Sequence, residues 1–422
     1  MRARLTLSSA LAFGTLVGAL ASSCQAYDFE PVEPLLIAQT TVEETISARK
    51  LKPNIMMLVD VSGSMTDPVD TTDPDCQVLE DGEFVLCGRT TPCNPAVCPT
   101  RWTELQAAVP RFLADSGPHV RFGLTTYPET RGETGLQAFC RPPTEFSVKK
   151  ALPEAEDDAS LLTHANEIDG ILQAIPNSGT GQPAGGTPTS ASLRFVGALE
   201  AMQSADRDDF VVLLTDGIPN CNFQNPNTGA NEAQCRCTLG PGQCVQGALQ
   251  AGCTDMDTSV TAVRELRERD ITTIVIGFGN ETVAGNGPAV LDGMARAGGF
   301  ARTCQDGQTS CGPNDSCDPT TNLCSRAYYQ AGNQQELAQA LEDISNAVLP
   351  GEPCLIKLDP SQVPSDPKLL VVYVEGEGIV SGPDTWELVE NGVRFTGATC
   401  DRILRSTPDA PIAVEVRAIR RR

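Results

Sequence analysis

The chain has 422 residues, which is enough for two domains and a sizeable hydrophobic core. Its 54 acidic and 31 basic residues give a formal net charge of -23. Because phosphate binding needs a basic surface, this balance argues against nucleic acid as a partner. The acidic residues form no single run, so most of them are predicted to lie on a solvated surface.

Residues 1–23 have the features of a signal peptide. Two arginines near the start precede an uncharged apolar run, 5–21, which is shorter than the ~20 residues that a membrane span needs. Two cleavage sites compete. Ala19 to Ala21 form an ordinary signal peptidase site, whereas the stretch ASSC at 21–24 resembles a bacterial lipobox in which Cys24 becomes lipidated. In that resemblance, Ala21 stands where leucine is usual.

Cysteine parity favours the lipoprotein reading. The chain has 17 cysteines, and lipidation of Cys24 leaves an even number that can pair fully in an oxidising compartment. Cleavage after Ala21 would leave one thiol over. We therefore expect an exported protein, anchored by lipid at Cys24 to the outer membrane or cell surface. A secreted or periplasmic protein is the alternative.

Strands and helices are predicted to alternate after a polar tether at 24–50. The segment NIMMLV at 54–59 is a continuous apolar run, typical of a strand that is buried on both faces of a parallel sheet. The runs at 210–217 and 271–279 repeat this type, and 120–127 indicates a half-exposed strand. Apolar residues recur at helical spacing in four further stretches: 102–112, 193–199, 260–266 and 337–348. This order predicts a doubly wound α/β domain with a mostly parallel sheet over residues 51–350.

Three cysteine-rich insertions interrupt this domain, at 66–99, 221–253 and 304–324. They are rich in Gly, Pro, Asn and Asp, which predicts loops that need cross-links to hold their shape. Zinc binding is the alternative, but export and the presence of only two histidines favour disulfides. The second insertion has an odd number of cysteines, so one of them is predicted to pair outside it, with Cys140.

The C-terminal residues, 351–422, consist of β-like runs separated by turns. Cys354 and Cys400 bracket most of these runs. We predict a small β-rich module that is closed by one disulfide.

Polar side chains gather where the predicted buried strands end. Asp60 ends the first strand and is followed by Ser62 and Ser64, Asp216 ends a later strand, and Thr187 lies in a Gly-rich loop before a helix. Because sites in open parallel sheets form at the carboxyl ends of strands, we expect these five side chains to meet. All five offer oxygen, which hard divalent cations prefer. The sequence therefore predicts a site for Mg²⁺, with Mn²⁺ or Ca²⁺ as alternatives, that leaves one position open to a partner's carboxylate.

This pattern resembles the metal-ion-dependent adhesion site of von Willebrand factor type A domains, which integrin inserted domains share. The resemblance rests on Asp-Val-Ser-Gly-Ser at 60–64, on GGTPT around Thr187 and on LLTDG around Asp216, and it covers about residues 50–350. It implies that Ser62, Ser64 and Thr187 contact the metal directly, and that the two aspartates hold it directly or through water. It also implies a protein partner that presents an Asp or Glu carboxylate to the ion.

Two functions follow from this resemblance. The first is a divalent-cation-dependent protein-binding domain that is displayed on a bacterial envelope. The second is a structural scaffold or assembly subunit, in which the metal only rigidifies the loop. In either case we expect substitutions such as Asp216→Ala to leave the fold intact, since the buried strands do not depend on these side chains.

Enzymatic readings fail at particular residues, and a hydrolase is the least favoured hypothesis. Ser62 stands where haloacid-dehalogenase-like phosphatases carry their second aspartate, and Asp60 replaces the first glycine of a Gly-x-Ser-x-Gly elbow. A histidine-based triad would have to use His119 or His164, which are both predicted to be ordinary surface residues. The chain is therefore expected not to be an enzyme.

Overall fold

The computed structural model describes residues 38–46, 52–88, 91–129, 135–203, 207–226, 237–238, 244, 249–279, 282, 287–304, 308–312, 315–348, 354–358, 367–389, 392–404 and 412–420. The predicted signal peptide and Cys24 lie outside these residues. Within them, no helix combines the length and the apolar character that crossing a membrane requires.

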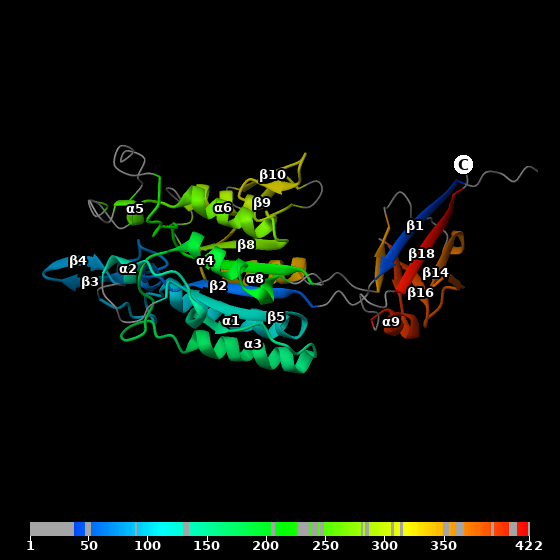
Figure 1. Ribbon diagram of the computed structural model, residues 1–422, viewed down its shortest axis with the longest axis horizontal. Helices are drawn as coiled ribbons and strands as arrows, with labels where there is room; N and C mark the ends of the chain where they lie inside the picture. The colour runs from blue at the N-terminus through cyan, green and yellow to red at the C-terminus, as the bar shows by residue number, and fades with distance from the viewer. Residues whose placement is uncertain are drawn as a thin grey trace, which may run out of the picture.

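A six-stranded sheet forms the centre of the α/β domain, with the order β12-β8-β7-β2-β5-β6 (Figure 1). Neighbouring strands pair in parallel, except for β5 and β6, which are antiparallel. The prediction of a mostly parallel sheet is confirmed. The strands are β2 (Asn54–Asp60), β5 (Arg121–Tyr127), β6 (Val148–Lys150), β7 (Asp209–Thr215), β8 (Ile271–Phe278) and β12 (Tyr329–Ala331).

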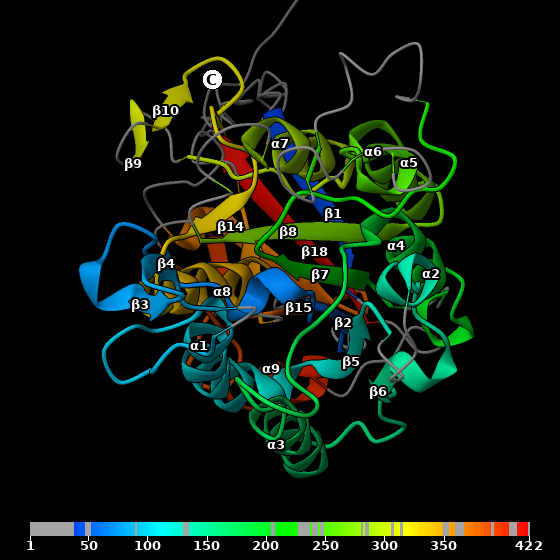
Figure 2. The same cartoon turned by 90° about the vertical axis from the view of Figure 1, so that its left-hand side faces the viewer.

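Helices cover both faces of this sheet, because alternate residues of the central strand β2 belong to two separate hydrophobic cores. Ile55 and Met57 pack in the core that includes residues of α1 (Arg101–Ser116), α3 (Asp158–Gln173) and α8 (Gln334–Val348). Met56 and Leu58 pack in the core that includes residues of α4 (Thr189–Gly197), α6 (Met256–Arg267) and α7 (Gly287–Ala297). Figure 2 shows α1 and α3 on one side of the sheet, and α6 and α7 on the other.

Disulfides hold the three insertions. The first contains the hairpin of β3 (Gln77–Glu80) and β4 (Glu83–Leu86), and the second contains α5 (Leu249–Gly252). The third contains β9 (Ser310–Gly312), β10 (Asp315–Asp318) and β11 (Leu323–Cys324). Their bridges are Cys76–Cys98, Cys87–Cys93, Cys237–Cys244, Cys304–Cys317 and Cys311–Cys324. The predicted cross-links are thus confirmed within the described residues.

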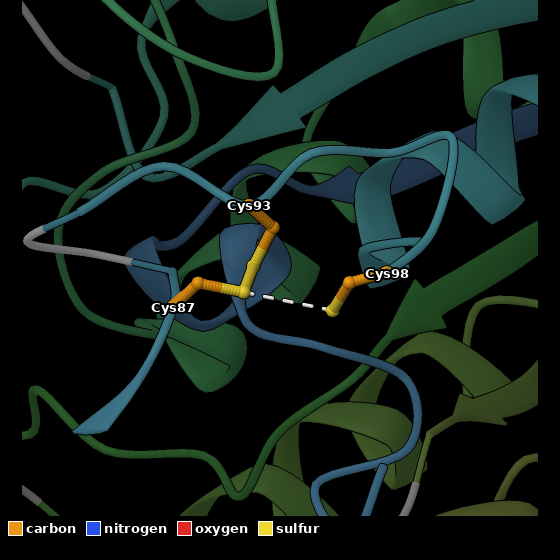
Figure 3. A group of neighbouring side chains, drawn as sticks. All are labelled: Cys87, Cys93 and Cys98. Carbon is orange, nitrogen blue, oxygen red and sulfur yellow. Dashed lines mark hydrogen bonds between the residues drawn. A yellow bond between two sulfur atoms is a disulfide. The ribbon is translucent and has the colours of Figure 1, made fainter. Parts of the chain in front are cut away.

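Among the described residues, two clusters of three cysteines, Cys87/Cys93/Cys98 and Cys304/Cys311/Cys324, bring sulfur atoms close together, and both consist of disulfides rather than free thiols. The Sγ atoms of Cys87 and Cys98 are 3.5 Å apart, and Cys93, bonded to Cys87, completes a three-sulfur cluster (Figure 3). Each of these sulfurs is already bonded in Cys76–Cys98 or Cys87–Cys93. Because zinc binds thiolates, this oxidised cluster does not offer zinc ligands.

The predicted bridge out of the second insertion is also confirmed, since Cys140 pairs with Cys221. Cys140 directly follows the short helix α2 (Leu136–Phe139), whereas Cys221 lies in the loop after β7. The disulfide therefore joins two loops at the carboxyl edge of the central sheet.

The C-terminal module contains two small antiparallel sheets, with orders β1-β18-β14-β15 and β13-β17-β16. Cys354–Cys400 is the predicted disulfide, and Val372, Trp386 and Phe395 belong to the core. The elements are β13 (Leu355–Lys357), β14 (Leu370–Val374), β15 (Glu377–Ile379), β16 (Trp386–Val389), β17 (Gly392–Phe395), α9 (Gly397–Leu404) and β18 (Ile412–Arg420).

One boundary of the predicted organisation needs correction. The expected tether at 24–50 contains β1 (Ala38–Ile46), which pairs antiparallel with β18 over nine residues (Figure 1). The segment AQTTVEETI is rich in β-branched residues, which favour strands, and it completes an edge of the C-terminal sheet. The module is therefore built from both sides of the α/β domain in the sequence.

Candidate metal centre

Parallel pairing brings Asp60 and Asp216 to the same edge of the sheet. Strand β2 lies between β5 and β7, and Val59 is in register with Leu214, so Asp60 ends beside Thr215. The Thr215 hydroxyl donates a hydrogen bond to Asp60 Oδ2 at 2.8 Å. Asp216 is the next residue of the chain, and both aspartates are fully buried.

The two predicted serines turn back over this edge. The Ser62 N–H donates to Asp60 Oδ1 at 2.8 Å, and the chain then enters a short 3₁₀ turn at Gly63–Thr66. The hydroxyl oxygens of Ser62 and Ser64 are 3.0 Å apart, and Ser64 Oγ donates to Asp216 Oδ1 at 2.9 Å. Both serines are buried, so the chain of contacts runs from Asp60 to Asp216 inside the protein.

Thr187 borders the same place. Its N–H donates to Asn220 Oδ1 at 2.7 Å, and its carbonyl accepts the Asn220 N–H at 3.0 Å. A Cβ atom on Gly217 would lie 3.7 Å from Ser64 Oγ and 3.8 Å from Thr187 Oγ1. The two hydroxyls thus approach one point from different loops. The structure brings all five predicted residues together, and metal binding by them stays a prediction.

The spacing of these oxygens fits a small divalent cation. Adjacent ligands of an octahedral Mg²⁺ lie about 3 Å apart when each is about 2.1 Å from the ion. The spacings between Ser62 Oγ and Ser64 Oγ, and between Ser64 Oγ and Asp216 Oδ1, are 3.0 and 2.9 Å. All the side-chain donors are oxygen, as hard cations require. The residues present therefore suit Mg²⁺ or a similar ion.

The electrostatics of the two aspartates also favour a cation. Burial, and then the nearby charge of Asp216, raise the pKa of Asp60 to about 7. Hydrogen bonds from Ser62 and Thr215 act in the opposite direction and favour the carboxylate. A divalent ion close to Asp60 would stabilise its charged form.

Arg101 belongs to this centre but was not predicted. It is the first residue of α1, which begins there because the Thr100 hydroxyl accepts the Thr103 N–H in a capping box. Arg101 Nη1 donates to Asp216 Oδ2 at 2.7 Å, and the two side chains are 1% and 0% exposed. Asp216 therefore holds a buried cation, so the expectation that Asp216→Ala leaves the fold intact must be revised.

Comparison with known proteins gives structural likenesses. No family model and no curated protein matches the sequence. The pilus adhesin SpaC from Lactobacillus rhamnosus GG is 13% identical, over 90% of this chain and 41% of that chain, with a TM-score of 0.39. This chain thus spans less than half of SpaC.

Two further solved structures are similar and contain a metal. Proximal thread matrix protein 1 from the mussel byssus, with a zinc-occupied MIDAS motif, is 12% identical over 75% of this chain and 50% of that chain, with a TM-score of 0.33. Manganese-loaded TRAP from Plasmodium vivax is 14% identical over 73% of this chain and 78% of that chain, with a TM-score of 0.32. Likenesses at this level do not establish a shared function.

The two histidines lie apart from the carboxylates of the centre. His119 is exposed after α1, and His164 Nε2 is 3.0 Å from the Ala151 carbonyl on the α3 side of the sheet. Three residues that hold the centre were missed, namely Arg101, Thr215 and Asn220. Thr215 directly precedes Asp216, but a threonine at the end of a predicted strand does not by itself indicate a role in a metal centre.

Proposed function

We propose that this protein is a divalent-cation-dependent protein-binding domain that acts outside the cytoplasm. The convergence of five buried oxygen-bearing side chains carries the proposal, and the spacings from Ser64 to Ser62 and to Asp216 are those of adjacent octahedral ligands. The resemblance of Asp60 to Ser64, Thr187 and Asp216 to the metal-ion-dependent adhesion site supports it. Mg²⁺ is the proposed ion, with Mn²⁺ or Ca²⁺ as alternatives.

The partner is proposed to be a protein that presents an Asp or Glu carboxylate. Three of the five ligands are neutral hydroxyls, and one of the two carboxylates is already paired with Arg101. A divalent ion held in this way keeps positive charge, which attracts a further carboxylate. With a net charge of -23, the rest of the chain repels acidic partners, so the ion decides where such a group docks.

The role of the metal is tested by comparing Mg²⁺ with EDTA for wild type and Ser62→Ala. Proteins captured from envelope extract in Mg²⁺ are purified and their affinity for the domain is measured. We expect EDTA or Ser62→Ala to weaken binding at least about tenfold, which corresponds to ~1.4 kcal/mol. Ser178→Ala replaces an exposed serine and serves as the matched control. The same affinity in every arm would rule out metal-dependent binding.

A scaffold is the second candidate, and one observation favours it. A chain of hydrogen bonds, from Ser62 to Ser64, from Ser64 to Asp216 and from Arg101 to Asp216, already holds the loop together without an ion. In that case the metal would only add rigidity. The same comparison of Mg²⁺ with EDTA separates the two functions, since a scaffold predicts lower thermal stability in EDTA but unchanged partner affinity.

An exported location is supported by the disulfides, which form and persist in oxidising compartments. We further propose a lipid anchor at Cys24. Cys24→Ser is expected to move the protein from the membrane fraction to the soluble fraction, as followed by fractionation and immunoblotting. A mature N-terminus at Ser22, found by mass spectrometry, would contradict lipidation.

A further inference from the structure

Arg101 is placed inside the proposed metal centre by three separate elements. Its Nη1 atom is 2.7 Å from Asp216 Oδ2, after β7, and 3.5 Å from the Ser64 carbonyl oxygen. Gly279, at the end of β8, lies against the rest of the side chain. A Cβ atom there would be 2.9 Å from Arg101 Nε, and Gly279 has a φ of +88°. A glycine is thus needed at this position, both for its backbone conformation and for the room it gives the arginine.

This position is unfavourable for a cation unless a carboxylate accompanies it. A buried guanidinium loses its hydration, and the N-terminus of a helix such as α1 carries partial positive charge. Arg101 is 1% exposed at the first residue of that helix. Asp216 supplies the compensating charge, so Arg101 and the proposed metal ion share the same carboxylate.

The shared carboxylate changes the charge of the centre. Asp60 and Asp216 together provide two negative charges in their ionised forms, and Arg101 offsets one of them. A divalent ion added to this set leaves the centre with a net positive charge. Without Arg101, the same ion would be fully neutralised by the two aspartates.

We propose that Arg101 is a positioning and charge-setting residue of the metal centre, which weakens binding of the bare ion and couples tight ion binding to the arrival of a carboxylate. This inference rests on the proposed function and names the regulation of that same site. The coupling is reciprocal, so a carboxylate strengthens the ion as much as the ion strengthens the carboxylate. Arg101 thereby favours an ion that is held together with a partner.

The test measures Mn²⁺ binding to the purified protein without any partner, from the EPR signal of free Mn²⁺. Arg101→Met removes the charge and keeps the length of the side chain. We expect it to bind Mn²⁺ about tenfold tighter or more, because a repelling charge close to the ion is lost. Arg111→Met, on the same helix, removes an arginine whose side chain is 74% exposed and should leave the affinity unchanged. Equal or weaker Mn²⁺ binding by Arg101→Met would overturn the inference and leave Arg101 as a support for Asp216 alone.

Acetate provides a second readout, as a probe for the partner's carboxylate. At constant ionic strength, acetate in place of chloride is expected to tighten Mn²⁺ binding more in wild type than in Arg101→Met. Equal acetate effects in the two proteins would contradict the proposed coupling. If Arg101→Met does not fold, Arg101→Gln removes the charge but keeps an N–H donor for Asp216, and the same results are expected of it.

The outcomes separate this inference from the proposed function. If neither wild type nor the Arg101 variants bind Mn²⁺, with or without acetate, both are wrong, because no metal centre exists. If wild type binds Mn²⁺ but the Arg101 variants do not bind it more tightly, only the role of Arg101 is wrong. Metal-dependent partner binding would then still be decided by the comparison of Mg²⁺ with EDTA.

Discussion

Asp216→Ala is expected to lower the free energy of unfolding by about 3–5 kcal/mol, which is the usual cost of removing one partner of a buried ion pair. The substitution takes the carboxylate away from Arg101, whose guanidinium is buried, and from the Ser64 hydroxyl. Urea unfolding in EDTA, followed by circular dichroism, measures the effect without a contribution from metal.

Asp115→Ala is the matched control for this measurement. Asp115 pairs with Arg111 on the surface of α1, and the Asp115 side chain is 69% exposed. Exposed pairs of this kind contribute about 0–1 kcal/mol, so this variant should unfold almost as wild type does. If Asp216→Ala and Asp115→Ala have equal stability, the buried pair of Arg101 and Asp216 does not stabilise the fold.

Metal binding is better tested by a substitution at Ser62 than by one at Asp216. A loss of partner binding by Asp216→Ala mixes the loss of a ligand with a loss of stability. Ser62→Ala removes a neutral hydroxyl whose described hydrogen bond is to Ser64 and not to a buried cation. Ser62→Ala is therefore the cleaner probe of metal binding, and Asp216→Ala is the probe of the ion pair.

Strands β2, β7 and β8 of the central sheet were predictable because their signal is local, whereas β5, expected to be half-exposed over 120–127, is buried at all but its first residue. NIMMLV at 54–59 and the runs at 210–217 and 271–279 are mostly apolar without alternation, as strands covered on both faces must be. The ends of such strands fix where Asp60 and Asp216 lie along the sheet. The gathering of the five predicted residues followed from that, together with the recognisable spacing of Asp60, Ser62 and Ser64.

Two features were not predictable, because their signals are not local. Strand β1 pairs with β18, near the other end of the chain, and a short polar stretch with β-branched residues does not reveal a distant partner. Arg101 follows a helix-capping threonine, where an arginine normally lies in solvent. Its burial depends on Gly279 and Asp216, which directly follow strands β8 and β7.

The disulfide Cys140–Cys221 is expected to have a large effect on both stability and metal binding. It closes a loop with a sequence separation of 81 residues, for which loop entropy predicts a contribution of about 4–5 kcal/mol. It also lies against the loop that carries Thr187. A Cβ atom on Gly186 would be 2.5 Å from Cys221 Sγ, and Asn220, which precedes Cys221, exchanges two hydrogen bonds with Thr187.

The test replaces both cysteines of this bridge with serine and compares the result with the double replacement of Cys237 and Cys244. The control bridge has a sequence separation of 7 residues, for which the same relation predicts only about 2–3 kcal/mol. Urea unfolding without reductant should therefore rank the Cys140/Cys221 variant as the less stable of the two. Its Mn²⁺ affinity should also fall, because Asn220 no longer holds Thr187 at a fixed position beside Ser64. Unchanged Mn²⁺ binding in a folded Cys140/Cys221 variant would show that the loop that carries Thr187 is positioned without this bridge.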